Sequence, residues 1–346
     1  MEVIRTGLLG LGGPARLLLE VVCKDDRFQL VGLADRDAGL VRRLASELGC
    51  EGYDDFRQFL INCRMDCLVV CEPLHRCLDH IKLGIERGIN ILKLAPMARG
   101  LPEAQELVGA ASHAGTRYDV LMLPGQAQAI GEVFALDEGQ GLRPVFLVSC
   151  TCEYGLGQQD RDLASWMPDR ALAGGGVLLY QGYGLVTQLI RQLGMPSKVY
   201  CQACHPRSGK ASAYLSEDAV AMVMRFPNNC AVAVNLIRYW DRSDCSLTMK
   251  VYIGDQIRIL EDQQILITDG PGRQVARSIK IDLPDTQARS AINEYASSLL
   301  GSEDEQSYDN TKLHIQVMVV IQAAYISAQT GFPEDPVSLF SGPTRS

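Results

Sequence analysis

The sequence predicts an N-terminal doubly wound α/β domain over residues 1–123 and a C-terminal α+β domain over residues 124–346. The chain of 346 residues exceeds the size at which one hydrophobic core stops growing. In its first third, short β-rich runs alternate with amphipathic helical stretches, which is the pattern of right-handed βαβ units and a parallel sheet. After Pro124 and Gly125 the runs lengthen and alternate apolar with polar residues, which indicates a mostly antiparallel open sheet with helices on one face.

The predicted elements of the first domain follow each other in regular alternation. Strands are predicted where short apolar runs are rich in β-branched residues, and helices where apolar residues return at intervals of three and four. The strands are 3–9, 30–34, 66–71, 90–94 and 119–123, and the helices are 16–23, 38–48, 77–87 and 102–114.

In the second domain, turn residues such as Pro227-Asn228-Asn229 and Asp269-Gly270-Pro271 separate the alternating runs. Two helices close the chain, and we expect them in the second domain or packed back on the first. The strands are 145–153, 198–205, 219–226, 231–239, 247–253 and 256–267, and the closing helices are 286–300 and 309–329.

The composition favours a small-molecule ligand over a nucleic acid or a membrane. Hydrophobic residues make up 47% and charged residues 21%, and the formal charge of −8 lacks the basic excess that a phosphate backbone requires. The N-terminus lacks the regions of a secretory signal, and the longest apolar stretch, 317–326, is too short to span a bilayer. These features predict a cytoplasmic protein.

Twelve cysteines are scattered through apolar segments, which favours reduced, buried thiols over a disulfide scaffold. Cys201, Cys204 and His205 match the C-x-x-C-H spacing of haem attachment, but the surrounding residues have the composition of a strand. No second ligand pair accompanies them, so we predict no metal site.

A glycine-rich turn follows the first predicted strand and opens a helix, with the residues Gly10, Leu11, Gly12, Gly13, Pro14 and Ala15. In a G-x-G-x-x-G/A motif one glycine permits the tight turn, the next lets the backbone approach a pyrophosphate, and the small last residue allows the helix to pack on the strand. The helix N-terminus adds N–H groups and a positive dipole end. Because such turns also form for steric reasons alone, the motif needs support from elsewhere in the chain.

That support comes from the second predicted strand, which ends in Asp35 and Arg36. Asp35 lies at roughly the 20-residue offset of a carboxylate that binds the ribose hydroxyls of a dinucleotide. A carboxylate there repels a 2′-phosphate, so NAD is the predicted cofactor, while Arg36 keeps NADP possible. The alternative for Asp35 is a solvated turn acid.

Four further segments resemble the Gfo/Idh/MocA oxidoreductase family (glucose-fructose oxidoreductase, inositol dehydrogenase, rhizopine catabolism). The resemblance extends over nearly the whole chain and implies a Rossmann-type first domain and a second domain for substrate binding and oligomerisation. The segments are Cys71-Glu72-Pro73-Leu74-His75, similar to the turn beside the nicotinamide; 88–98, similar to the run with Glu-Lys-Pro; Trp166 with Gly174-Gly175-Gly176; and the ending 323–333.

The resemblance also implies a catalytic Lys and a substrate-orienting Asp and His, and this sequence lacks all three. Counting from Pro96 places Ala95 at the Lys position and Leu94 at the Glu position. Counting from the glycine triplet places Tyr180 at the Asp position, Gly184 at the His position and Thr187 at a second Asp position.

Other residues near these positions could take the roles of the missing Lys, Asp and His. Lys93 shares a strand face with Ala95, about 6.6 Å away, and we expect it to pair with Glu72 near the nicotinamide. A purely structural ion pair is the alternative. Tyr180 and Tyr183 are further proton-transfer candidates, although tyrosines more often pack in cores. The resulting cofactor-binding set is Gly10, Gly12, Gly13, Pro14, Ala15, Asp35, Arg36, Glu72, Pro73, His75 and Lys93.

Two functions remain open from the sequence. The first is an NAD-dependent dehydrogenase of a sugar, cyclitol or similar polyol, with Lys93, Tyr180, Tyr183 or Glu72 as candidate catalytic residues. The second is a catalytically inactive dinucleotide- or sugar-binding sensor or partner subunit, which the missing Lys, Asp and His favour. In this family another subunit usually covers the second domain's sheet, so a homodimer or homotetramer is expected.

Overall fold

A computed structural model describes the structure of the following residues: 3–13, 15–122, 126–135, 144–156, 165–205, 216–261, 264–269, 274–280, 285–300 and 310–340. The chain forms two compact units. Unit 1 comprises residues 1–98, 102–124 and 284–314, and unit 2 comprises residues 99–101, 125–283 and 315–346.

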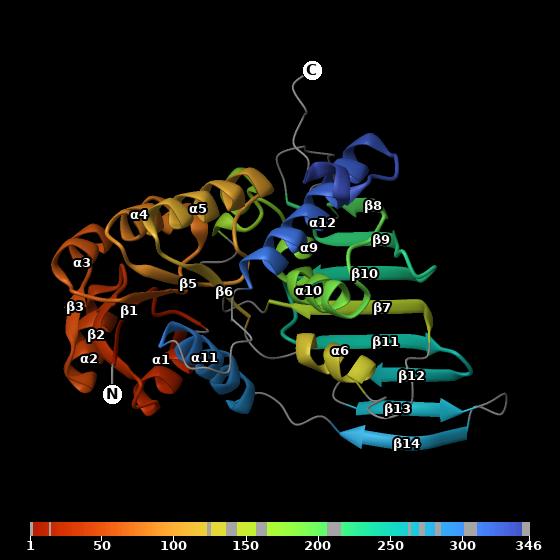
Figure 1. Ribbon diagram of the computed structural model, residues 1–346, viewed down its shortest axis with the longest axis horizontal. Helices are drawn as coiled ribbons and strands as arrows, with labels where there is room; N and C mark the ends of the chain where they lie inside the picture. Colours follow the sequence, from red (N-terminus) through yellow and green to blue (C-terminus); the bar gives the residue numbers. More distant parts are fainter. Residues whose placement is uncertain are drawn as a thin grey trace. The chain divides into compact units, whose positions relative to one another are not determined.

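Unit 1 is built on a six-stranded sheet, and all the pairings within it are parallel (Figure 1). Its order, β3-β2-β1-β4-β5-β6, places β1 at the centre and brings the carboxyl ends of all strands to one edge. The strands are β1 (Ile4–Leu9), β2 (Phe28–Ala34), β3 (Glu51–Tyr53), β4 (Cys67–Val70), β5 (Asn90–Leu94) and β6 (Tyr118–Leu121).

Helices cover the sheet of unit 1 and complete its core. Apolar residues of α1 pack with Leu8, Leu33 and Leu92 of the sheet in one buried cluster. Tyr295 of α11 belongs to the same cluster, and Arg27 binds Asn293 and Ser297 of that helix. The helices are α1 (Ala15–Lys24), α2 (Ala38–Leu48), α3 (Phe56–Asn62), α4 (Leu74–Glu86), α5 (Leu101–Ala114, mostly in unit 1) and α11 (Asp285–Leu299).

Unit 2 is built on an eight-stranded sheet in the order β14-β13-β12-β11-β7-β10-β9-β8. Its pairings are antiparallel except for that of β10 with β7, which is parallel. The strands are β7 (Val145–Gly155), β8 (Lys198–Cys204), β9 (Ala219–Arg225), β10 (Ala231–Tyr239), β11 (Cys245–Ile253), β12 (Gln256–Glu261), β13 (Gln264–Asp269) and β14 (Gln274–Lys280).

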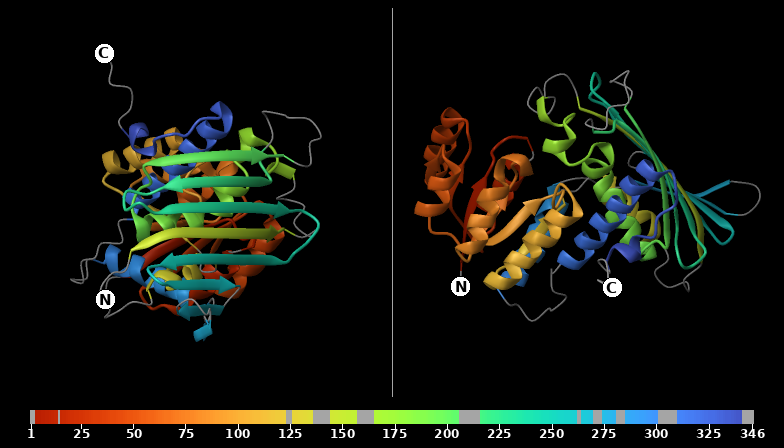
Figure 2. Two further views of the ribbon diagram at one scale, coloured as in Figure 1. Left: turned by 90° about the vertical axis from the view of Figure 1, so that its right-hand side faces the viewer. Right: turned by 90° about the horizontal axis from the view of Figure 1, so that it is seen from above.

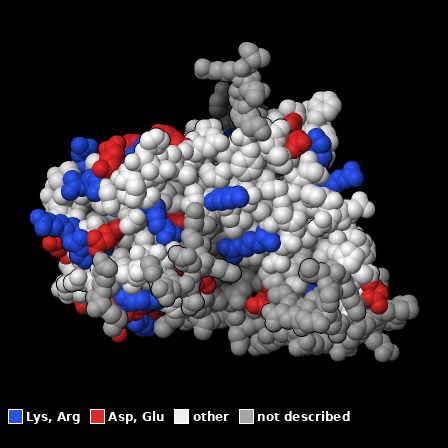
Figure 3. All heavy atoms as spheres, in the orientation of Figure 1, with Lys and Arg blue, Asp and Glu red and all other residues white. Residues whose placement is uncertain are grey.

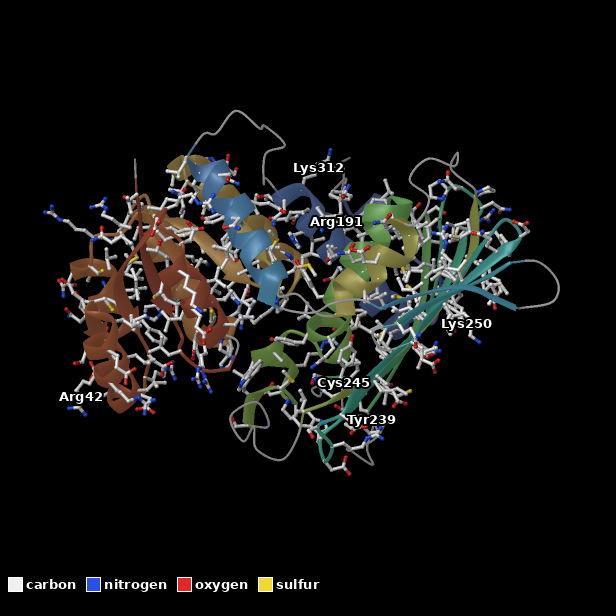
Figure 4. All side chains as sticks on the ribbon, turned by 90° about the horizontal axis from the view of Figure 1, so that it is seen from below. Arg42, Arg191, Tyr239, Cys245, Lys250 and Lys312 are labelled. Atoms are coloured by element: carbon white, nitrogen blue, oxygen red, sulfur yellow. The ribbon has the colours of Figure 1, made fainter. Side chains whose placement is uncertain are left out.

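Helices cover one face of this sheet, and none of the described helices lies on the other face, as the left view of Figure 2 shows. Alternation along the strands produces this difference: in β10, Val232, Val234 and Leu236 are buried, whereas Ala231 and Asn235 are exposed. On β11, Lys250 points away from the helices (Figure 4). The helical elements are α6 (Gln126–Ala135), α8 (Arg170–Ala173), α9 (Val177–Tyr180), α10 (Gly182–Leu193), α12 (Thr311–Thr330) and the 3-10 turn Pro336–Leu339.

The predicted fold class is confirmed, with differences in detail. The structure adds β3, α3 and β14, which the sequence did not predict. The run 256–267, predicted as one strand, forms the antiparallel pair β12 and β13. The helix predicted to begin at residue 77 begins at Leu74, directly after Pro73.

Three further expectations concern surfaces and sulfur atoms. All twelve cysteines are free thiols, and Cys201 is buried in β8 whereas Cys204 is exposed. No described helix is long and apolar enough to cross a bilayer. On the described part of the face in Figure 3, acidic and basic side chains are interspersed over unit 1 without a continuous basic field.

Candidate functional site

The glycine-rich turn joins β1 to α1 at the carboxyl edge of the sheet in unit 1. Gly10 has a φ of 88°, and a Cβ atom at this position would lie 2.8 Å from the backbone nitrogen of Glu72. Gly13 also has a positive φ, of 47°. Because L side chains rarely adopt such angles, the fold itself requires glycine at both positions.

Gly12 differs from its neighbours because the fold does not require it. It has no positive φ, and no described atom lies within 4 Å of the position that a Cβ atom would take. A missing side chain that leaves open space beside a helix N-terminus suits a ligand that approaches the backbone. The predicted Pro14 lies outside the described residues, and Ala15 is buried as the first residue of α1.

Asp35 directly follows β2 and lies next to the glycine-rich turn. Its carboxylate accepts hydrogen bonds from the backbone N–H of Leu11, at 2.7 Å, and from that of Asp37, at 2.9 Å. The half-buried Asp35 is therefore fixed next to the glycine turn rather than solvated as an isolated turn acid. Arg36 is exposed, with its guanidinium 5.8 Å from the ring centre of Phe56.

Glu72 follows β4 and lies against the same turn. Its Oε2 atom is 3.1 Å from the Cβ position of Gly10, and its Oε1 atom is 3.3 Å from the Nη1 atom of Arg76. Burial raises the pKa of the Glu72 carboxyl group, while the nearby Arg76 acts against that shift. Pro73 and the half-buried His75 lie at the start of α4, next to Glu72.

The expected ion pair between Glu72 and Lys93 does not form, because each head group has another partner. Lys93 is buried in β5, and its Nζ atom donates a 2.6 Å hydrogen bond to the carbonyl oxygen of Leu94. Burial lowers the pKa of Lys93. Burial also raises the pKa of the nearby Cys71 and Cys77 to about 12, so neither thiol is an anionic partner near neutral pH.

The candidates of unit 2 are packed into its interior. Tyr180 donates from its hydroxyl to the carbonyl oxygen of Ala173 at 2.8 Å, and its ring lies edge-on to Trp166 at 5.6 Å. Tyr183 is buried, and so is Thr187, which donates to the carbonyl oxygen of Tyr183 at 2.8 Å. Gly184 provides no side chain.

Sequence reasoning missed a carboxylate that organises the glycine triplet. Glu217 is buried and accepts hydrogen bonds from the backbone N–H of Gly176 at 2.9 Å and Leu178 at 3.0 Å, and from the Tyr325 hydroxyl at 3.0 Å. Its only sequence signal is the polar run Ser216-Glu217-Asp218 directly before the alternating β9. Arg76 was also missed, because the helix was predicted to begin only at residue 77 and its i,i+4 spacing from Glu72 was not used. Among the described residues, no group of three or more His, Cys, Asp and Glu side chains is arranged to hold a metal ion.

Comparison with known proteins agrees with this geometry. Residues 4–122, from β1 to the end of β6, match the family described as "Oxidoreductase family, NAD-binding Rossmann fold", Gfo/Idh/MocA. The match is confined to this part of the chain. No curated protein sequence matches significantly.

Solved structures of several oxidoreductases share the fold of nearly the whole chain. The WlbA dehydrogenase from Bordetella pertussis, in complex with NADH and UDP-GlcNAcA, is 17% identical, with a TM-score of 0.76 over 96% of this chain and 99% of the other. An oxidoreductase from Agrobacterium radiobacter, in complex with NAD+, L-tartaric acid and magnesium, is 13% identical, with a TM-score of 0.76 over 97% and 99%. Biliverdin reductase from Synechocystis, in complex with biliverdin and NADP+, is 14% identical, with a TM-score of 0.76 over 94% and 99%.

The described residues fit the nicotinamide dinucleotide that the family's fold implies. Gly12 leaves the backbone of the turn accessible, and Asp35 is fixed where β2 ends. Glu72, in contrast, places a negative charge next to the turn, and this charge opposes the binding of dinucleotide phosphates.

Proposed function

We propose that the chain binds NAD at the glycine turn of unit 1 and acts as a dehydrogenase of a sugar, cyclitol or similar polyol. The observation that carries the proposal is the open Cβ position of Gly12 next to the fixed carboxylate of Asp35. Backbone N–H groups of the turn and of the start of α1 bind the pyrophosphate, and Asp35 accepts hydrogen bonds from ribose hydroxyls. Arg36 is the exposed cation that would pair with the additional phosphate of NADP.

In this proposal the Nζ atom of Lys93 accepts the proton of the substrate hydroxyl group. When bound, the nicotinamide supplies the hydride acceptor. Burial lowers the pKa of Lys93, which makes the neutral amine easier to reach and allows Nζ to accept a proton. This role requires the Nζ atom to leave the carbonyl oxygen of Leu94, its partner in the structure.

A second candidate function is a catalytically inactive sensor or partner subunit that binds a dinucleotide or a sugar-like ligand. The hydrogen bonds that engage Lys93 and Tyr180 with backbone carbonyl groups favour this candidate. Both functions share the dinucleotide site, so binding alone does not separate them.

Replacing Lys93 by methionine separates the two functions. If Lys93 transfers the proton, Lys93→Met lowers polyol-dependent NADH formation about 100-fold or more while NAD binding persists. The variant should also unfold at a higher temperature, because a buried amine without a counter-ion costs free energy. The measurements are nicotinamide absorbance with a panel of polyols and a thermal unfolding curve.

Two results would contradict the enzymatic proposal in different ways. Full turnover by Lys93→Met would remove Lys93 from the reaction. Firm NAD binding by the unaltered protein with no turnover on any polyol would support the sensor or partner subunit instead.

We further propose that a second copy of the chain covers the open face of the sheet in unit 2. This face exposes Val223 (52%), Phe146 (48%) and Tyr200 (38%), and large apolar areas are seldom left in water. Sedimentation should therefore show a dimer or tetramer, and Val223→Lys should shift it toward the monomer. Leu172→Lys, at an exposed leucine of α8, is the matched control and should leave the assembly unchanged. A monomeric unaltered protein would contradict the proposal.

A further inference from the structure

Glu72 occupies an unusual position for a carboxylate. Its Oε2 atom lies 3.1 Å from the Cβ position of Gly10, in the turn whose backbone amides are suited to an anion. Helix N-termini and glycine-rich turns favour negative ligands, so an acid beside them acts against the ligand that the turn attracts. The side chain is only 12% exposed, so water screens this charge poorly.

Arg76 compensates for part of this negative charge. Its Nη1 atom lies 3.3 Å from the Oε1 atom of Glu72, whereas the Oε2 atom lies toward Gly10. The other charged or titratable groups near Glu72 come from four neighbouring elements: Asp35 and Arg36 at the end of β2, Lys93 of β5, Cys71 at the end of β4, and His75 and Cys77 of α4. Asp35 is also an acidic residue, so two carboxyl groups flank the turn.

We propose that Glu72 is a charge filter of the glycine turn, which weakens dinucleotide binding when it is ionised and permits tighter binding when it is protonated. This inference rests on the proposed function, because it concerns the ligand of the same turn. Ionised Glu72 repels the diphosphate of NAD, and protonated Glu72 removes that repulsion without removing the side chain.

The sign of the pH dependence follows from the burial of this carboxyl group. Burial raises the pKa of Glu72, so protonation begins at a higher pH than for an exposed glutamate. Bound phosphate favours the protonated form further, so NAD binding takes up a proton. The dissociation constant for NAD therefore falls as the pH falls.

Calorimetric titration of NAD+ into the unaltered protein and into Glu72→Gln tests the filter. Glutamine keeps the shape of the side chain without its charge. Near pH 8 Glu72→Gln should bind NAD+ about tenfold more tightly than the unaltered protein, and this ratio should shrink as the pH is lowered and Glu72 becomes protonated. Glu20→Gln, on the exposed surface of α1, removes the same charge elsewhere in unit 1 and should leave the binding unchanged.

Three outcomes would contradict the inference. Equal or weaker binding by Glu72→Gln near pH 8 would overturn the filter while leaving NAD binding intact. Equal tightening by Glu20→Gln would assign the effect to net charge rather than to this position. No heat from any of the three proteins would contradict the proposed function itself, and the filter with it.

Discussion

Replacing Gly12 by valine is expected to abolish NAD binding while the protein stays folded. The open Cβ position means that valine fits the ligand-free protein, and the absence of a positive φ means that valine avoids the strain of a left-handed conformation. The same side chain fills the space through which a pyrophosphate reaches the backbone, so affinity should fall by about 100-fold or more. Stability should change by no more than about 0.5 kcal/mol. Calorimetry and thermal unfolding measure the two effects.

Gly109 provides the matched control, because it lies in α5 and no described atom beyond its chain neighbours and its own helix backbone lies within 4 Å of its Cβ position. Gly109→Val should bind NAD as the unaltered protein does. Undiminished NAD binding by Gly12→Val would show that the open space of the turn is not the ligand site.

Removing the carboxylate of Glu217 is expected to give the largest loss of stability. Glu217→Ala leaves the backbone N–H groups of Gly176 and Leu178 and the hydroxyl of Tyr325 without their acceptor. Each buried polar group left unsatisfied costs about 1–3 kcal/mol, so the free energy of unfolding should fall by roughly 4 kcal/mol. Denaturant unfolding followed by circular dichroism measures the change.

Two further variants check the origin of this loss. Tyr325→Phe removes one of the three hydrogen bonds and should cost about 1 kcal/mol. Glu153→Ala removes a carboxylate that is 33% exposed on β7 and should have little effect. A loss from Glu217→Ala no larger than that from Glu153→Ala would refute the role of Glu217 in holding the glycine triplet.

The first half of the chain was the more predictable part of the fold, because its strands are continuous apolar runs separated by amphipathic helices. β3 escaped prediction because Glu51-Gly52-Tyr53 is short and has no buried residue to mark it. β12 and β13 merged into one predicted strand because the residues between them, Asp262 and Gln263, include neither glycine nor proline.

The parts of the candidate site that follow from a fixed spacing in the sequence were predictable. The offset of Asp35 from the glycine turn indicated their proximity, which the hydrogen bond to Leu11 confirms. The partner of Glu72 was wrongly predicted because a residue one helical turn away, Arg76, competes with the cross-strand Lys93. Glu217 was not predicted because its partners, Gly176 and Tyr325, lie about 40 and 108 positions away in the sequence, and no local pattern encodes such a contact.

The most direct test of the central claim is a calorimetric titration of NAD+ into the unaltered protein and into Asp35→Ala. We expect saturable binding with one site per chain, and an affinity weaker by about tenfold when the carboxylate that binds the ribose is removed. The absence of heat with both NAD+ and NADP+, or binding of NAD+ by Asp35→Ala as tight as that of the unaltered protein, would contradict a dinucleotide site at the glycine turn.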